Sequence, residues 1–202
     1  MLKEHRSREG TPRLRLFVAI LLPDSWLARL SDVQRELRQA GLGLRFVRPE
    51  GIHLTLKFLG ETPIDRIAAI EQALTEAAAG VRPFTLHLGG LGTFGPPRHP
   101  RVVWAGIDGD RPHLHELVDA VERSLHRIGV APEQRAFNPH LTLARVSDQL
   151  PAAEAARIVP VLAARWWQAT ESLSFDSISL VRSELGAGGA RYTALGTWRL
   201  DG

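Results

Sequence analysis

The sequence predicts an α+β fold with largely antiparallel sheets, and three observations support this prediction. Segments with strand character often follow one another directly, which favours antiparallel pairing. Segments with helical periodicity lie between other strands and mostly end at a glycine. The motif His-Leu-Thr-Leu occurs at residues 53–56 and again at 140–143, and the two halves of the chain have a similar order of elements. We therefore expect a bilobal, pseudo-twofold architecture.

Eight segments are expected to form strands. The first is a continuous apolar run with β-branched and aromatic members, which is typical of a buried strand. The last two are joined by a glycine-rich turn, Gly-Ala-Gly-Gly. In order along the chain, the expected strands lie at 15–22, 44–47, 52–60, 83–92, 101–107, 138–146, 175–185 and 190–200.

Alternation within the two motif strands predicts which side chains share a face. The polar face is expected to carry, in the first strand, His53, Thr55 and Lys57, and in the second, His140, Thr142 and Ala144. The opposite face of the first strand is expected to carry Leu54, Leu56 and Phe58. Each strand should therefore present a histidine and a threonine together, about 7 Å apart along the strand.

Four segments show helical periodicity. The first lies between Pro23 and Gly41, and its apolar residues recur at helical spacing after a Pro-Asp-Ser start. Gly80 and Gly129 follow the second and third segments, at 64–79 and 111–128, and are expected to end them. The fourth segment, at 151–164, contains Pro160, which is expected to bend or break it.

The composition is that of one globular domain. The chain has 202 residues, of which 44% are apolar, enough to bury a substantial interior. Residues 1–12 carry scattered charges without the apolar core of a secretory signal, so we expect a flexible extension before a single bilobal domain at 13–202. The sequence contains no run of 18 apolar residues, which predicts no membrane span and a cytoplasmic location.

The cysteine and arginine contents limit the chemistry. Cysteine is absent, which excludes disulfides and thiol catalysis and leaves only histidines and carboxylates as zinc ligands. The formal net charge is +3, yet the isoelectric point is about 10.1, because only two of the 25 basic residues are lysines. A coding bias toward arginine and a preference for phosphorylated ligands are both consistent with this composition.

The repeated His-x-Thr pattern is more specific than the leucines beside it, because leucine is the common choice for any half-buried strand. Two such strands side by side would bring two imidazoles and two hydroxyls together. Free imidazole titrates near 6.5, so one ring can donate a proton while the other accepts one. The threonine hydroxyls can donate hydrogen bonds to phosphate oxygens. The pattern therefore predicts acid–base catalysis at phosphorus that requires neither a metal nor a cofactor.

Four segments resemble the two-histidine phosphoesterase superfamily: HLTLKFLG, HLTLARV, RLFVAILLP near the start and VRSELGAGGARY near the end. Within it, the chain is most similar to the bacterial RNA 2′,3′-cyclic phosphodiesterases, also called 2′-5′ RNA ligase or LigT-like proteins, over about residues 13–200. The resemblance implies sheets that line a central cleft, with helices on the outer faces. It also implies hydrolysis of RNA or nucleoside 2′,3′-cyclic phosphate to a 2′-phosphate, with weak 2′-5′ RNA ligase activity.

Matched residue by residue, the resemblance makes His53 the general acid that protonates O3′ and His140 the general base that activates water. Thr55 and Thr142 would hold the phosphate oxygens. Arg145 follows His140 by five residues and would be a further phosphate ligand, or else a solvated surface residue.

Three further residues have two interpretations each. Phe17, in the first strand, would stack on a nucleobase or pack in the core. Phe46 precedes the first motif and is a second candidate for base stacking, which single-stranded RNA binding commonly uses. Lys57 would contact a phosphate or lie solvated at the rim.

The expected partners are RNA ends that carry a 2′,3′-cyclic phosphate, as in tRNA processing, and small cyclic nucleotides. No metal and no membrane are expected to take part, and the protein is expected to be a monomer. Two alternatives stay open. One is a phosphodiesterase of the same superfamily that acts on 2′-5′ oligoadenylate or ADP-ribose cyclic phosphate, and the other is a module that binds RNA ends without catalysis.

Overall fold

The computed structural model describes residues 11–164, 172–186 and 189–202. The predicted N-terminal extension, residues 1–12, lies outside them except for its last two residues. Within the described ranges the elements are β1 Arg13–Leu21, α1 Asp24–Gln39, β2 Leu44–Phe46, β3 His53–Pro63, α2 Ile67–Ala78, β4 Phe84–Phe94, β5 Val102–Gly109, α3 Arg111–Arg127, β6 His140–Val146, α4 Ala152–Ala163, β7 Ser172–Phe175, β8 Ser177–Gly186 and β9 Gly189–Arg199. All eight expected strands and all four expected helices are present, with ends shifted by a few residues.

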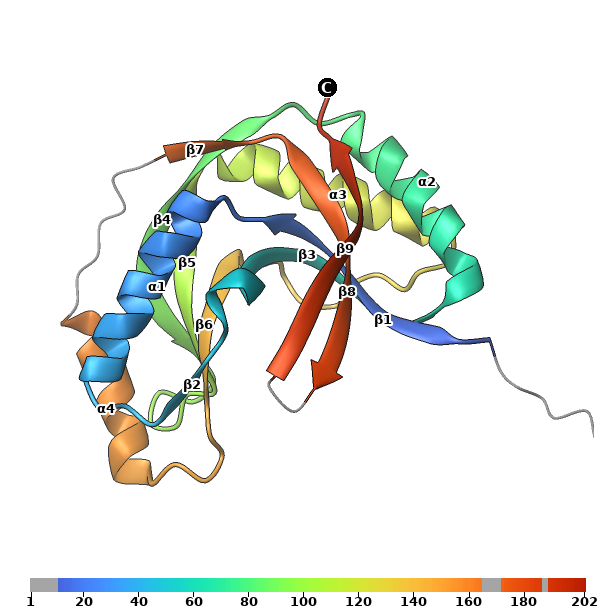
Figure 1. Cartoon of the computed structure of the whole chain (residues 1–202). Helices are drawn as coiled ribbons and strands as arrows, with labels where there is room; N and C mark the ends of the chain where they lie inside the picture. Colours follow the sequence, from blue (N-terminus) through green and yellow to red (C-terminus); the bar gives the residue numbers. More distant parts are fainter. Residues whose placement is uncertain (1–10, 165–171, 187–188) are drawn as a thin grey trace, which may run out of the picture.

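The strands form one antiparallel sheet in the order β7-β4-β5-β6-β3-β1-β8-β9, and β2 pairs with β6 beside this path. The sheet curls into a half-barrel with the helices on its outer side (Figure 1). This confirms the predicted α+β class and the antiparallel pairing. The two motif strands, β3 and β6, are neighbours at the middle of the sheet, although they lie far apart in the sequence.

Two lobes meet at these central strands, and each lobe contains elements from both halves of the chain. Lobe A comprises β3, β1, β8 and β9 with α2 and α3, and lobe B comprises β6, β5, β4 and β7 with β2, α1 and α4 (Figure 1). The histidines of the two motifs are 87 positions apart, and so are the starts of α1 and α3. Each of these helices follows a strand of one lobe and then packs on the other lobe. The two halves of the chain are therefore interlocked.

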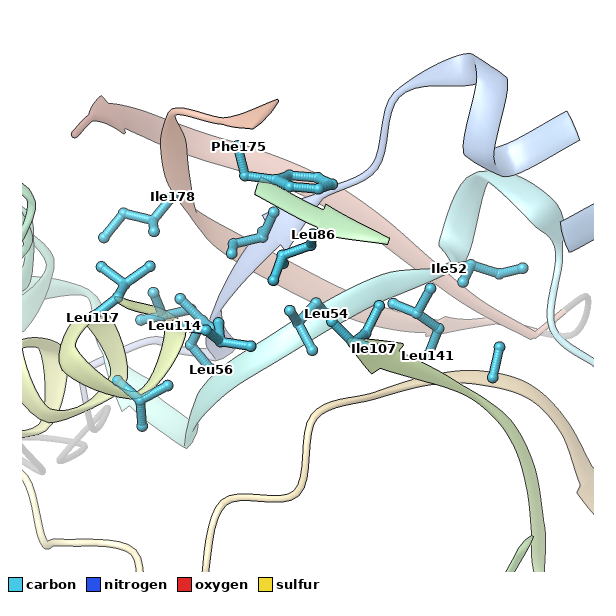
Figure 2. Packing of buried hydrophobic residues seen from close by; sticks show 14 of the residues in the cluster. Ile52, Leu54, Leu56, Leu86, Ile107, Leu114, Leu117, Leu141, Phe175 and Ile178 are labelled. Atoms are coloured by element: carbon cyan, nitrogen blue, oxygen red, sulfur yellow. The ribbon is translucent and has the colours of Figure 1, made fainter. Parts of the chain in front are cut away.

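The leucines of both motifs belong to the hydrophobic core. Leu54 is 1% exposed and Leu141 is fully buried, and both project from the central strands into the surrounding apolar residues (Figure 2). The same cluster includes Leu114 and Leu117 of α3 and Phe175 of β7. Burying a leucine contributes about 2 kcal/mol each, so this core determines which face of β3 and β6 turns inward.

A β-bulge occurs at the second leucine of each motif. In β3, Thr55 and Lys57 lie opposite consecutive residues of β1, so Leu56 has no partner there. In β6, Leu143 likewise has no register partner on β5. A bulge places two successive side chains on the same side and reverses the alternation that follows. The burial patterns of the two strands agree through this point, with a buried residue and then an exposed one after the second leucine.

The bulges correct three sequence predictions. Lys57 does not share the face of His53 but is buried, and Phe58 is 62% exposed instead of packing in the core. Ala144 is buried rather than lying beside His140, and Arg145 is exposed in its place. Simple alternation fails here because it assumes one residue per position, whereas each bulge inserts an extra one.

Each bulge makes a polar contact with one of the two helices that cross between the lobes. The Lys57 ammonium lies 2.8 Å from a Glu122 carboxylate oxygen of α3 and donates a 2.8 Å hydrogen bond to the Ala131 carbonyl. In lobe B, the buried amide of Gln34 on α1 donates a 2.9 Å hydrogen bond to the Leu143 carbonyl. Lys57 is therefore neither a phosphate contact nor a solvated rim residue.

Two smaller differences concern element boundaries. Helix α4 continues through Pro160 to Ala163 and does not break at the proline. The strand expected at 175–185 corresponds to β8, which pairs with β1, but its first residue, Phe175, ends a separate strand, β7, which pairs with β4. The chain therefore passes from lobe B to lobe A at Asp176.

The Lys57–Glu122 pair is predicted to stabilise the fold strongly. Glu122→Gln is expected to lower the free energy of unfolding by about 3 kcal/mol, because it leaves a buried ammonium without its counter-charge. Urea denaturation at neutral pH would measure this loss. Glu76→Gln is the matched control, since it removes the exposed pair with Arg127 and is expected to cost less than about 1 kcal/mol. Equal losses in both variants would contradict the structural role of Lys57.

Candidate active site

The two motif strands pair at a single position, where Leu54 lies opposite Leu141 in antiparallel register. Continued by one residue on either side, this register sets His53 opposite Thr142 and Thr55 opposite His140. Because Leu54 and Leu141 point into the core, the four polar side chains point to the other face. Directly opposed residues lie about 5 Å apart and diagonal ones about 7–8 Å apart. The two histidines therefore lie diagonally across one small polar patch.

Both histidine rings are held in the same way. Nδ1 of His53 lies 2.8 Å from the Gly51 carbonyl, and Nδ1 of His140 lies 2.8 Å from the Asn138 carbonyl. A carbonyl only accepts, so each Nδ1 carries the proton and donates it. Each Nε2 is thereby left to accept or donate a proton at the sheet face. We call this face, which the helices leave uncovered, the histidine face.

Aromatic side chains surround the histidine of lobe A more closely than that of lobe B. The ring of Phe17 stacks on His53 with centroids 4.6 Å apart, and Tyr192 meets the same imidazole edge-on at 5.0 Å. Phe94 meets His140 edge-on at 4.7 Å. These contacts exclude water from part of each ring while leaving Nε2 unbonded among the described residues.

Burial lowers the pKa of both imidazoles. For His53, burial is the largest cause, the hydrogen bond to Gly51 opposes it, and a positive charge on His140 lowers the pKa further. For His140, burial lowers the pKa and the hydrogen bond to Asn138 opposes it. The effect of one ring on the other indicates that the two share one electrostatic environment, as a diagonal pair should.

The remaining predicted residues divide between the two faces of the sheet. Thr55 and Thr142 are half-buried on the histidine face, and neither hydroxyl has a hydrogen-bond partner within the described residues. Arg145 is exposed on that face as well, beyond the bulge. Phe17 is also there, but it is 2% exposed and supports His53. Phe46 does not join them, because it lies opposite buried Ala144 and packs against the core.

Sequence reasoning missed several residues of this face. Tyr192, the only tyrosine of the chain, comes from β9 and contacts both Phe17 and His53. Trp104 lies opposite Thr142, and its ring covers Gly92, where a Cβ atom would come within 2.3 Å of it. Phe94 lies between this ring and His140. A glycine facing a tryptophan across a hairpin was the available signal, whereas nothing local marked Tyr192.

Two hollows among the described residues lie away from the motif histidines. One of about 380 Å³ lies between α2 and α3, and a second of about 260 Å³ lies beside Pro23; neither is lined by a motif histidine. Among the residues that the structure describes, no three potential metal-ligating side chains gather at one place. No helix in those same ranges is long and apolar enough to cross a membrane.

A half-barrel sheet whose two central strands each present His-x-Thr defines the class of two-histidine phosphoesterase folds, and comparisons with known proteins agree. A family model described as the 2′-5′ RNA ligase superfamily matches residues 22–187. An RNA 2′,3′-cyclic phosphodiesterase of Methanothermobacter thermautotrophicus is 32% identical over 190 residues, which cover 93% of this chain and 100% of that protein. The chain belongs to the 2′-5′ RNA ligase superfamily.

Solved structures show the same fold. The protein TT0787 of Thermus thermophilus superposes with a TM-score of 0.76 at 28% identity, covering 94% of this chain and 99% of its own. LigT of E. coli in its apo form superposes with a TM-score of 0.73 at 26% identity, covering 95% of this chain and 100% of its own. LigT has also been solved in complexes with 3′-AMP and with phosphate.

The lowered histidine pKa values predict that mild acid destabilises the protein. Below the ordinary pKa of 6.5, the unfolded chain binds protons that the folded chain resists, so stability is lost as the pH falls. A His53→Gln/His140→Gln variant should lose less stability than the wild type between about pH 7.5 and pH 5.5. Urea denaturation across this range would test it. His126→Gln, an exposed position on α3, serves as the control and should behave as the wild type.

Proposed function

We propose that this protein hydrolyses RNA or nucleoside 2′,3′-cyclic phosphate to a 2′-phosphate by paired histidine catalysis without a metal. One observation supports this most directly: two imidazoles on adjacent strands are held in the same tautomer, with both Nε2 atoms on one face. The relatives named RNA 2′,3′-cyclic phosphodiesterase, and the LigT complexes with 3′-AMP and phosphate, support the substrate class.

The proposed reaction is one displacement at phosphorus with balanced proton transfers. Nε2 of neutral His140 takes a proton from water as the water oxygen forms a bond to phosphorus. The bond from phosphorus to O3′ breaks, and protonated His53 delivers its Nε2 proton to O3′. Thr55 and Thr142 donate hydrogen bonds to the two non-bridging oxygens, where negative charge is held. The cycle closes when solvent returns each ring to its starting protonation state.

The same displacement accounts for the proposed weak ligase activity. If a 5′-hydroxyl of RNA takes the place of water, the product is a 2′-5′ phosphodiester and a free O3′. Water is far more abundant, so hydrolysis should dominate. DNA lacks the 2′-oxygen that forms the ring, and is therefore not a substrate.

Two alternatives differ from this proposal in measurable ways. A phosphodiesterase for 2′-5′ oligoadenylate or ADP-ribose cyclic phosphate would use the same four side chains but would turn over those compounds in preference. A module that only binds RNA ends would show no turnover. Substrate profiling of the purified protein with 2′,3′-cyclic AMP, 2′-5′ oligoadenylate and ADP-ribose cyclic phosphate in excess EDTA, followed by identification of the product isomer from the cyclic AMP, distinguishes the three. We expect adenosine 2′-phosphate.

Replacing either histidine is predicted to abolish most of the activity. His53→Ala and His140→Ala should each lower kcat by about 10²- to 10⁴-fold, since each ring moves a proton in the transition state. Steady-state kinetics with 2′,3′-cyclic AMP would measure the loss, and His126→Ala should retain wild-type rates. Near-normal turnover in either active-site variant would refute the proposed catalytic pair, and dependence of wild-type turnover on added metal would refute the metal-free mechanism.

The division of roles between the histidines needs its own test. The Nδ1 hydrogen bond of His53 is partly buried and that of His140 is exposed. In the free protein this favours placing a single proton on the better solvated His140, whereas the proposed mechanism requires it on His53 once substrate is bound.

A substrate with sulfur in place of O3′ is predicted to identify the acid. A thiolate leaves without protonation, so loss of the general acid should matter little with this substrate. We expect the activity of His53→Ala on the sulfur substrate to be about 10²-fold or more above its activity on the oxygen substrate. His140→Ala should not recover, because water must still be activated. Recovery of His140→Ala alone would reverse the assignment.

A further inference from the structure

The carbonyl that holds His53 belongs to a glycine in the connection between the lobes. β2 of lobe B leads through a short 3₁₀ helix, Pro49–Gly51, into β3 of lobe A. The Gly51 carbonyl accepts the hydrogen bond from Nδ1 of His53. The N–H of the same peptide, which belongs to Ile52, donates a 3.0 Å hydrogen bond to the Pro49 carbonyl. The position of this one peptide therefore decides how the imidazole is oriented and which ring nitrogen carries the proton.

The two motifs restrain the acceptor carbonyl by different means. In the second motif the acceptor is Asn138, and it is followed by Pro139, whose ring restricts the backbone on both sides of that peptide. In the first motif the acceptor is Gly51, and it is followed by Ile52. Glycine has the least restricted backbone of all residues, and isoleucine has no ring that closes on the peptide. The local sequence thus restrains the carbonyl in lobe B more than the one in lobe A.

The ring of Tyr192 lies directly against this glycine. A Cβ atom on Gly51 would come within 3.2 and 3.3 Å of two carbons of the Tyr192 ring. The φ of Gly51 is not positive, so the close approach, and not the backbone conformation, is what favours glycine here. The same tyrosine ring meets His53 edge-on at 5.0 Å and Phe17 edge-on at 5.4 Å. One aromatic ring therefore contacts the acceptor residue, the imidazole and the ring that stacks on the imidazole.

The aromatic ring of Tyr192, and not its hydroxyl, makes these contacts. Within the described residues the hydroxyl has no hydrogen-bond partner. Tyr192 lies on β9, at the edge of the sheet in lobe A, and the curl of the sheet brings β9 against the 3₁₀ helix that precedes β3. A strand from the end of the chain thus restrains the connection on which the first motif depends.

We propose that Tyr192 is a positioning residue for His53. Its ring packs on Gly51 and on the imidazole, which keeps the Nδ1 proton on the Gly51 carbonyl and directs Nε2 toward the leaving oxygen. This inference rests on the proposed function for the role of His53 as the general acid. Tyr192 acts through His53 and makes no contact with the reacting atoms. In lobe A the tyrosine thereby does what the proline of the second motif does in lobe B.

The tautomer of His53 tests this without any need for turnover. The measurement is ¹⁵N NMR of the imidazoles in the full-length protein at about pH 8, above the ordinary imidazole pKa. A fixed tautomer gives two well-separated ring-nitrogen shifts, whereas exchange between tautomers averages them. In Tyr192→Leu the shifts of His53 should move toward their average, while those of His140 stay separated. Tyr192→Phe should keep the wild-type pattern for both histidines, because it retains the ring.

Trp198→Leu is the matched control for loss of an aromatic residue from β9. Trp198 lies on the same strand and is also half-buried, but it packs against the hydrophobic core. Urea denaturation should show a loss of stability in this variant. Its histidine shifts and its kcat should stay as in the wild type, which separates positioning of His53 from general support of the fold.

Kinetics give a second readout. Tyr192→Leu should lower kcat on 2′,3′-cyclic AMP by about ten- to 10²-fold with little change in KM, since a small misplacement of a catalytic group has an effect of this size. Most of this loss should disappear with the substrate that has sulfur in place of O3′, because a thiolate leaves without an acid. Phe94→Leu removes the ring beside His140 and should lose activity equally on both substrates. Tyr192→Phe should recover most of kcat.

Gly51→Ala tests the same contact from the other side and leaves β9 intact. The added Cβ atom would have to displace the Tyr192 ring by a few tenths of an ångström, so kcat should fall. In a Tyr192→Leu background the same substitution should cost less, because the ring that it crowds is gone. Equal effects in the two backgrounds, or unchanged His53 shifts in Tyr192→Leu, would overturn the inference. Failure of the wild type to hydrolyse 2′,3′-cyclic AMP would instead count against the proposed function, so the two failures are distinguishable.

Discussion

One antiparallel pair, Leu54 opposite Leu141, joins the two lobes at the middle of the sheet, and the geometry of the site depends on it. Both leucines are buried, so the hydrophobic free energy that holds them also sets the orientation of their neighbours. In antiparallel strands the residues before and after such a pair must project to the opposite side. The polar side chains that this brings together are His53, Thr55, His140 and Thr142. The leucines of the motif are thus structural, and they position the residues proposed to carry the chemistry.

A single pair of residues would hold the lobes together only weakly if they were otherwise separate. The two helices that cross between the lobes provide further contacts. Helix α3 reaches lobe A through the Glu122–Lys57 ion pair, and α1 reaches lobe B through the hydrogen bond from Gln34 to the Leu143 carbonyl. Both contacts lie at the bulges that end the two motifs. Because each of these helices directly follows a strand of the other lobe, each buried polar contact ties the chain of one lobe to the other. The distance between the histidines is therefore held from both sides.

The fold class, the order of elements and the four motif side chains could be predicted from sequence, because alternation and helical periodicity are local properties. What depended on partners elsewhere in the chain could not. The bulge after Thr55 exists only in relation to β1, and it reversed the predicted positions of Lys57 and Phe58. Tyr192 reaches His53 from a strand 139 positions away, and no spacing in the sequence indicates that contact.

Duplication of one motif creates a chemical difficulty, since two identical histidines would be protonated together. The structure counters this in two ways. The surroundings differ, because His53 is enclosed by Phe17 and Tyr192 whereas His140 meets only Phe94 among the ring contacts of the described residues. The rings also interact, since a charge on His140 lowers the pKa of His53. A proton on one ring therefore opposes protonation of the other ring, which widens the pH range in which the pair holds a single proton. That singly protonated state is the one that acid–base catalysis by two histidines requires.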